Sequence, residues 1–261
     1  MSNVHSPEVA TLPNPAILCR TQQLPPAIAL LSFLAASAAL AQSPAPNPAS
    51  DFIQRIDSAV NARYTTLVGY TAQEHYALYR NGAKDPSSEM TVNTVYTQSG
   101  GKQYTHVSHS GSDFLRHTIL EKVLANEFEA NKVANRSQSW LNSANYEMRV
   151  NPAKVTYAGR DCYLVNIAAR RKSPSLFNGR AWFDASDATL VRLEGAPAKA
   201  PAFFAGDTTV ARDYTHIEGF AMATHAEAHT QSFLIGNILL TIDYTGYKLT
   251  HAQPPNPAQS H

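Results

Sequence analysis

The chain has 261 residues, with 21 Lys and Arg against 20 Asp and Glu, so its formal net charge at pH 7 is +1. This balance excludes a general nucleic-acid or other polyanion-binding protein, because such affinity needs a clustered excess of cations. A hydrophobic fraction of 44% excludes a mostly disordered chain, and the length allows one large β domain or two small ones.

The first predicted element is a secretory signal peptide. Residues 27–41 read AIALLSFLAASAALA, follow Arg20, and end in the A-x-A-like sequence of Ala39 and Ala41. The apolar segment is shorter than the ~20 residues that a membrane-spanning helix needs. We therefore expect residues 1–41 to be cleaved after Ala41, which gives a periplasmic or secreted protein that is not integral to the membrane. A retained membrane anchor is the alternative.

Cleavage would also decide the thiol chemistry of the mature chain. It removes Cys19 and leaves Cys162 alone, so no internal disulfide is expected and the domain must be stabilised by its core. Cys162 is predicted to be a small buried hydrophobe rather than a nucleophile.

A Pro-rich linker is predicted over residues 42–50, before the first helix. We expect Ser50 or Asp51 to cap that helix, because apolar residues from Phe52 to Tyr64 recur at helical spacing. A second helix is predicted over residues 114–134, with Asp113 as its N-cap.

The rest of the chain reads as β structure, with turn residues between short segments of β-prone residues. Gly-containing turns are expected near residues 99–102, 158–160 and 218–219. The predicted strands are 67–80, 91–98, 103–108, 155–157, 161–169, 180–183, 189–194, 209–217, 220–232 and 237–248. The tail, residues 251–261, is predicted to be disordered.

Alternation of side chains separates two faces of this sheet. Phe183 is expected opposite Trp182, Val191 and Leu193 share the apolar face, and Leu240 and Ile242 belong to another apolar row. Since helices do not alternate with strands, the pattern predicts an α+β fold, a curved antiparallel sheet with helices packed against its concave side, in a single domain of residues 51–250.

No catalytic motif is found in the sequence: there is no G-x-S-x-G elbow, Walker loop, G-x-G-x-x-G or H-E-x-x-H. No enzyme activity and no cofactor are therefore predicted. Asp184 and Asp187 form a possible carboxylate pair, but they flank a hairpin turn, where Asp is favoured for its hydrogen bonds to the backbone. We interpret them as turn residues.

The sharpest metal candidate is the sequence His225-Ala226-Glu227-Ala228-His229. On a strand, His225, Glu227 and His229 share one face, but successive ligands would be about 7 Å apart, too far to meet on zinc without a bulge. On a helix only the two His would align. We interpret the segment as the solvated outer face of a strand, and a metal-dependent hydrolase is the less favoured alternative; no metal site is predicted.

Two further segments have alternative interpretations. Arg170, Arg171 and Lys172 suit either a solvated hairpin end or contact with lipid head groups. Phe203 and Phe204 lie in a loop between strands, where adjacent Phe residues are unusual unless they pack on something. They either plug the end of the core or line the mouth of an apolar cavity.

The sequence resembles the outer-membrane lipoprotein-sorting superfamily, the periplasmic lipoprotein carriers of LolA and LolB type. The resemblance covers roughly residues 155–249. It lies in the segments LFNGRAWFD (176–184), LVRLEG (190–195), PAK (197–199), RDY (212–214), GF (219–220) and LTIDY (240–244). It implies a half-open antiparallel β-barrel of about ten or eleven strands, closed by helices, whose apolar interior accepts acyl chains of lipoproteins or lipids.

Together these observations predict a non-catalytic binding protein of the periplasm or the cell exterior. We expect a lipid or an acyl chain, possibly that of a lipoprotein, to be its partner. The predicted ligand-binding residues are Phe183, Val191, Leu193, Phe203, Phe204, Leu240 and Ile242. The alternative is a sensor or interaction module that fills its own interior and docks an envelope protein.

Overall fold

A computed structural model of the chain describes residues 48–201, 206–232 and 236–252. By its internal contacts the chain divides into Met1–Pro44 and Ala45–His261, and all described residues belong to the second unit. The predicted signal peptide, the linker up to residue 47, Phe203 and Phe204 lie outside the described residues.

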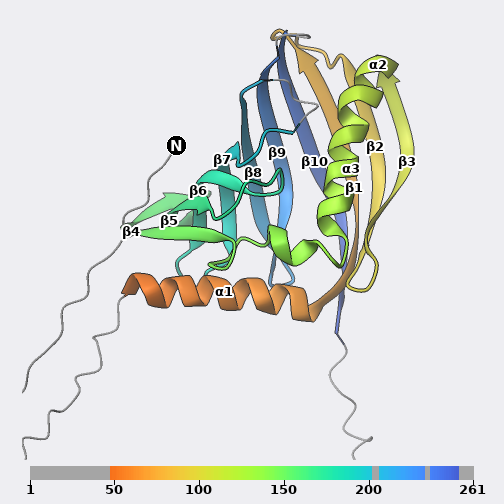
Figure 1. Cartoon of the computed structure of the whole chain (residues 1–261). Coiled ribbons are helices and arrows are strands. Elements are labelled where there is room, and N and C mark those ends of the chain that lie inside the picture. Colours follow the sequence, from red (N-terminus) through yellow and green to blue (C-terminus); the bar gives the residue numbers. More distant parts are fainter. Residues whose placement is uncertain (1–47, 202–205, 233–235, 253–261) are drawn as a thin grey trace, which may run out of the picture. The chain divides into compact units, whose positions relative to one another are not determined.

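A single antiparallel sheet is the centre of this unit (Figure 1). Its strands follow the spatial order β3-β2-β1-β10-β9-β8-β7-β6-β5-β4, so β3 and β4 are edges that do not pair with each other. The strands are β1 (Leu67–Arg80), β2 (Ser88–Thr97), β3 (Gly101–Gly111), β4 (Tyr146–Tyr157), β5 (Arg160–Ala169), β6 (Phe177–Asp184), β7 (Leu190–Pro197), β8 (Thr208–Ile217), β9 (Phe220–Ser232) and β10 (Gly236–His251). The predicted α+β fold with an unclosed antiparallel sheet is confirmed.

The hairpin turns confirm the local turn predictions. Ala158 and Gly159, and likewise Glu218 and Gly219, all have φ between 48° and 85°. Two consecutive positive φ angles give the turn whose twist matches that of antiparallel strands.

Strand β4 is longer than the three residues predicted for it. Its register against β5 shifts between Val150 and Lys154, around Pro152. Because β4 is an edge strand, Pro152 can interrupt the hydrogen-bonded ladder without breaking the sheet. At the other end of the chain, the prediction that the disordered tail begins at residue 251 is wrong for His251, which is the last residue of β10 and pairs with Leu67. Residues 253–261 lie outside the described part.

Helix α1 (Pro48–Thr66) begins earlier than predicted, so neither Ser50 nor Asp51 is its first residue. Proline suits the first turn of a helix, where its missing N–H has no intrahelical partner. The helix lies beside β4 and β5 in Figure 1 and packs on the part of the sheet formed by β4 to β7, where it buries Phe52 and Ile56.

The second predicted helix consists of three pieces: α2 (Asp113–Leu115), a π-helical turn (Arg116–Leu120) and α3 (Glu121–Asn131). Its N-cap is Ser112, whose hydroxyl accepts a hydrogen bond from the Leu115 backbone N–H, and not Asp113 as predicted. A short 3-10 helix (Arg136–Ser139) follows.

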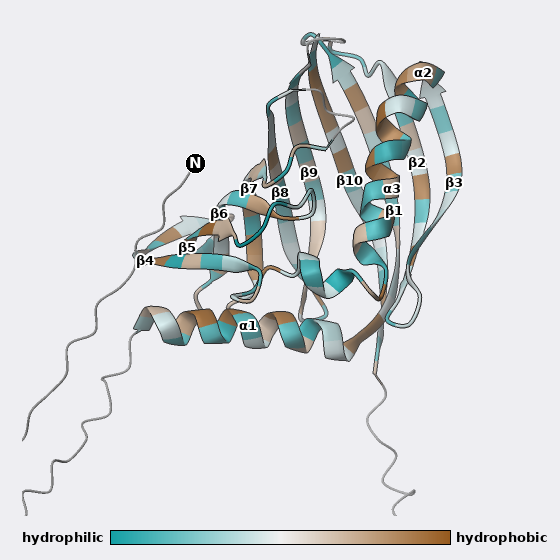
Figure 2. Ribbon diagram, viewed as in Figure 1, coloured by the Kyte–Doolittle hydropathy of each residue, from teal (hydrophilic) through white to brown (hydrophobic). Residues whose placement is uncertain are grey.

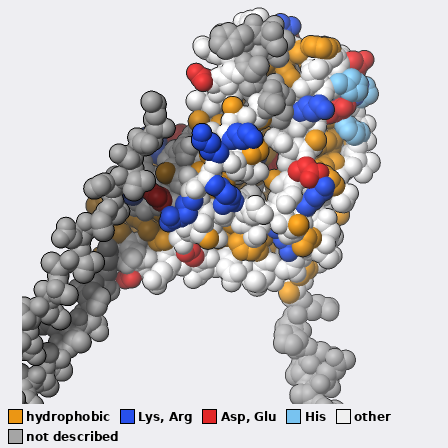
Figure 3. All heavy atoms as spheres, in the orientation of Figure 1, with side chains coloured by type: hydrophobic (Ala, Val, Ile, Leu, Met, Phe, Trp, Pro, Cys, Tyr) orange, Lys and Arg blue, Asp and Glu red, His pale blue; other side chains and the backbone are white. Residues whose placement is uncertain are grey.

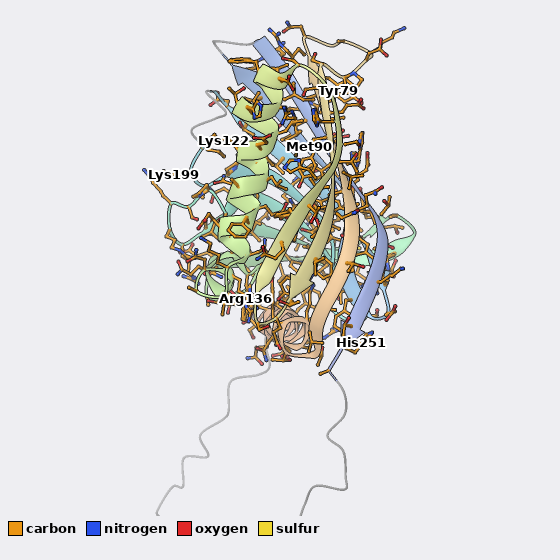
Figure 4. The ribbon with its side chains drawn as sticks, turned by 90° about the vertical axis from the view of Figure 1, so that its right-hand side faces the viewer. Tyr79, Met90, Lys122, Arg136, Lys199 and His251 are labelled. Atoms are coloured by element: carbon orange, nitrogen blue, oxygen red, sulfur yellow. The ribbon has the colours of Figure 1, made fainter. Side chains whose placement is uncertain are left out.

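Helix α3 and the π-helical turn lie on the concave side of the sheet, as Figure 4 shows. There Met90 of β2 lies in the layer between helix and sheet, whereas Lys122 points away from it. Ile119 and Leu120 of the π-helical turn are buried in a cluster with residues of β1, β2, β9 and β10. None of the helices in the described residues is long and apolar enough to cross a membrane.

The buried apolar side chains form three separate clusters. One lies under α3 against β1, β2, β9 and β10; a second lies between α1 and β4 to β7; a third surrounds Tyr70, Tyr96 and Met222. Figure 2 shows the brown, apolar bands that alternate along β9 and β10. Cys162 is fully buried and forms no disulfide, and burial raises the pKa of its thiol, as expected of a structural cysteine.

Candidate ligand cavity

A cavity of about 620 Å³ lies between the concave face of the sheet and helices α1 and α3. Residues of all three apolar clusters line it, among them Tyr244 of the first, Phe183 of the second and Met222 of the third. The clusters therefore remain separate because the space between them is open. Its volume is typical of sites that take a small molecule or a lipid chain.

The wall on the sheet side is largely apolar. It is built from inward-facing residues of four strands: Phe183, Leu193, Ala226, Ala228, Leu240 and Ile242. Strict alternation along each strand directs these side chains to one face and leaves their neighbours outside. The small residues Ala226 and Ala228 of β9 leave the room that larger side chains occupy elsewhere.

Four of the residues predicted from the sequence to bind the ligand line this cavity: Phe183, Leu193, Leu240 and Ile242. Val191 is buried but does not line it. The register of β7 against β6 slips between Trp182 and Phe183, so that Phe183 pairs with Leu190 and Val191 is bypassed. The bulge brings Leu190 to the cavity in place of Val191. Sequence alternation does not reveal such a shift.

A buried polar network lies beside the apolar wall. Glu74 of β1 accepts hydrogen bonds from the hydroxyls of Tyr76 (2.6 Å) and Thr94 (2.8 Å), and its carboxylate is 3.4 Å from the Lys102 ammonium. Lys102 of β3 also forms an ion pair of 2.8 Å with Glu127 of α3. One ammonium group thus joins the sheet to the helix that covers it.

The protonation of this network follows from its contacts. Burial disfavours the charged form of Lys102, but the carboxylates of Glu127 and Glu74 outweigh it and raise the pKa of Lys102 well above its usual value. Burial likewise acts to raise the pKa of Glu127, and the nearby Lys102 and Arg212 lower it overall. The ion pair therefore stays charged at neutral pH.

Two arginines that were not among the predicted ligand-binding residues also line the cavity. Arg63 of α1 lies over the Tyr64 ring and donates a hydrogen bond to the Met222 sulfur at 3.7 Å. Arg212 of β8 lies with its guanidinium carbon 5.9 Å from the centre of the Tyr244 ring. None of the ion pairs among the described residues includes either arginine. In the sequence, Arg212 appears only as part of the RDY segment of the resemblance, with no role assigned to it.

The histidine candidates lie on strand β9, so the helical alternative for this segment is wrong. His225 contacts Asp243 through Nδ1 (2.6 Å) and Glu227 through Nε2 (3.1 Å), and His229 contacts the other oxygen of Glu227 at 3.4 Å. The side chains are thus bonded to one another. Across the described part of the chain, no group of three or more His, Cys, Asp or Glu side chains is arranged to hold a metal ion.

The carboxylates at the hairpin after β6 have the predicted turn role. Asp184 accepts a hydrogen bond from the backbone N–H of Ser186 at 2.8 Å, and Asp187 accepts one from that of Thr189 at 2.9 Å. Asp184 also forms an ion pair of 3.1 Å with Arg160.

The basic segment after β5 is held to the loop before β4. Arg170 donates to the Ser143 carbonyl, and Arg171 donates to the Asn145 side chain and the Gln138 carbonyl. These contacts favour the hairpin-end interpretation for both arginines.

On the face of the molecule that carries α3, Figure 3 shows Lys and Arg side chains gathered beside the helix.

Comparisons with known proteins find similar structures but no similar sequence. No family model matches the sequence, and neither does any curated protein. A LolA superfamily protein from Nitrosomonas europaea matches 80% of this chain and 96% of its own at 11% identity, with a TM-score of 0.43. An outer membrane lipoprotein-sorting protein domain from Vibrio parahaemolyticus matches 79% and 95% at 10% identity, with a TM-score of 0.45.

A DUF1329 family protein from Desulfovibrio piger matches 78% of this chain and 94% of its own, at 12% identity and a TM-score of 0.39. Each of the three matches covers at least 94% of the solved chain and at least 78% of this chain.

Proposed function

We propose that this protein is an exported, non-catalytic carrier that holds the acyl chain of a lipid or lipoprotein in the cavity between sheet and helices. The observation that carries the proposal is the cavity itself, about 620 Å³ in volume and lined by three apolar clusters that do not merge. Phe183, Leu193, Leu240 and Ile242 contact the chain in this proposal.

The energetics of such a wall suit an acyl chain. Each methylene group that leaves water for an apolar surface contributes about 0.8 kcal/mol. A long chain is therefore bound firmly without a directional contact along its length. The small side chains of Ala226 and Ala228 on β9 contribute to this site, because they leave space in the cavity for the acyl chain.

Export of the protein is proposed on the sequence of residues 27–41, which has the composition of a secretory signal. An acyl chain that crosses an aqueous compartment must be shielded from water for the whole passage. A cavity between a sheet and two helices would provide that shielding in a periplasmic or secreted protein.

The test is to purify the mature, exported protein from the envelope of its own cells, extract it with organic solvent and identify bound lipid by mass spectrometry. We expect reproducible recovery of a lipid with at least one acyl chain, and uptake of a fluorescent fatty acid by the stripped protein. Recovery of no lipid together with no uptake would overturn the proposal. A specific partner found by crosslinking in such a preparation would then favour a protein-interaction module.

A further inference from the structure

Arg212 occupies an unusual place for an arginine, in the middle of an apolar wall. It lies on β8 between Val210 and Tyr214, which line the cavity from the same face of the strand. In the sheet it pairs with Leu193 of β7 and Ala226 of β9, both of which also line the cavity. Its side chain is thus surrounded by the surface proposed to hold an acyl chain.

Among the described residues, no carboxylate forms an ion pair within 4.0 Å with the Arg212 guanidinium. A guanidinium group stays protonated at every accessible pH and has five N–H donors. Its neighbours are the ring of Tyr244 and the side chain of Tyr214, neither of which carries a negative charge at neutral pH. Glu127 interacts with it electrostatically, but the 2.8 Å ion pair of that carboxylate is with Lys102, and no ion pair within 4.0 Å joins it to Arg212.

Arg212 differs in this respect from Lys102, another cation that lines the cavity. Lys102 is buried and has two carboxylates within 4 Å, as buried charges usually do. Arg212 also lines the interior, yet all ion pairs of the described residues leave it out. A permanently charged guanidinium that lies beside an apolar wall and has no carboxylate partner is available to bind an anionic ligand group.

A polar group without a hydrogen-bond partner lies on the aromatic residue beside Arg212. In the described part of the chain, the buried hydroxyl of Tyr244 has no hydrogen-bond partner. This hydroxyl belongs to the ring over which Arg212 lies, and Tyr244 comes from β10, two strands away from β8. Buried polar groups in native proteins are nearly always hydrogen-bonded. A hydroxyl that can donate, beside a guanidinium without a carboxylate partner within 4.0 Å, is therefore suited to a ligand that carries acceptor oxygens.

Building on the carrier function proposed above, we infer that Arg212 and the Tyr244 hydroxyl bind the anionic head group of the amphiphile whose chain fills the cavity. The head group is a carboxylate or a phosphate, since both accept the paired N–H donors of a guanidinium. The acyl chain then lies along Leu240 and Ile242, and the cavity selects acidic single-chain lipids over neutral ones.

The test measures binding of three lipids that share one acyl chain: palmitate, palmitoyl lysophosphatidic acid and monopalmitoylglycerol. We expect the wild-type protein to bind at least one of the acidic lipids about tenfold or more tightly than the neutral one. Arg212→Gln should abolish this preference while it retains affinity for monopalmitoylglycerol. Arg212→Lys should restore part of the preference, and Tyr244→Phe should lower it severalfold. Which acidic lipid binds more tightly identifies the head group as carboxylate or phosphate.

Arg149→Gln, at an exposed site on β4, is the matched control and should leave the preference unchanged. Circular dichroism and thermal unfolding establish that each variant is folded. Equal affinity of the wild type for acidic and neutral lipids would overturn the head-group inference and leave the carrier function standing. Loss of the preference in Arg63→Gln but not in Arg212→Gln would also overturn it. Failure to bind any of the three lipids would overturn the carrier function itself.

Discussion

The ammonium of Lys102 and the carboxylate of Glu127 are 2.8 Å apart and join an edge strand to the helix that covers the concave face of the sheet. The same ammonium is 3.4 Å from Glu74, so a single cation compensates two carboxylates. Its removal therefore leaves more than one uncompensated charge in the interior.

The first prediction concerns this ion pair. Lys102→Met should lower the free energy of unfolding by about 3–5 kcal/mol, because it leaves two buried carboxylates without their cation. Urea denaturation followed by circular dichroism measures the loss. Lys132→Met is the control: Lys132 forms a 2.6 Å ion pair with Glu129, both exposed, and its loss should cost less than about 1 kcal/mol. Equal losses in the two variants would contradict a structural role for the buried pair.

The second prediction concerns pH. Burial acts to lower the pKa of His225, but hydrogen bonds to Asp243 and Glu227 outweigh it and raise the pKa overall. A raised pKa means that the folded state binds the proton more tightly than the unfolded state. The stabilisation is therefore complete below about pH 6.5, the pKa of an unperturbed histidine, and it is lost as the pH rises through the raised value.

His225→Gln should remove this contribution, which we expect to be below about 1 kcal/mol because the pair is partly exposed to solvent. The measurement is the unfolding free energy of both proteins across pH 5 to 9. The difference between wild type and variant should shrink towards alkaline pH, and Asp243→Asn should show the same trend. A difference that grows with pH would contradict the assigned sign.

The third prediction tests the cavity. Ala226→Phe places a large side chain in the space between β9 and α3, so it should lower the affinity for a fluorescent fatty acid by about tenfold or more. Ala168→Phe, at an exposed position of β5, is the control and should not change affinity. If both variants bind as the wild type does, the chain is held somewhere else.

The fourth prediction concerns the cover of the cavity. Ile119 in the π-helical turn is 1% exposed and packs in the cluster beneath α3. Ile119→Ala should lower the unfolding free energy by about 2–5 kcal/mol, the usual cost of truncating a buried aliphatic residue. Val107→Ala, at a half-exposed position of β3, should cost no more than about 0.5 kcal/mol. Similar costs at the two sites would show that this turn is not packed as described.

Local patterns in the sequence predict most of the strands, because a hairpin turn and the alternation beside it depend on neighbouring residues. The turn at Ala158 and Gly159 is of this kind, and so is the inward orientation of Leu240 and Ile242. The helix cap at Ser112 was missed because Asp113 is an equally good capping residue by type. Geometry alone distinguishes the two.

The remaining features depend on contacts between distant parts of the chain. The bulge at Val191 follows from how β7 pairs with β6, and the partner of Lys102 comes from a helix 25 residues later in the chain. Within the described part of the chain, Arg212 has no carboxylate within 4.0 Å, and this depends on how β8, β9, β10 and α3 pack together. The spacing of apolar residues along the sequence predicts none of these three features.

The unpaired edges of the sheet, β3 and β4, affect how the cavity can accommodate its contents. A closed barrel has a fixed circumference, since any widening breaks backbone hydrogen bonds between its strands. In this sheet the strand order ends at β3 on one side and β4 on the other, so the two ends can move apart while every ladder between neighbouring strands stays intact. In the carrier proposed above, the interior would therefore expand for a thicker or branched chain by rearranging side-chain contacts, without the loss of hydrogen bonds between neighbouring strands.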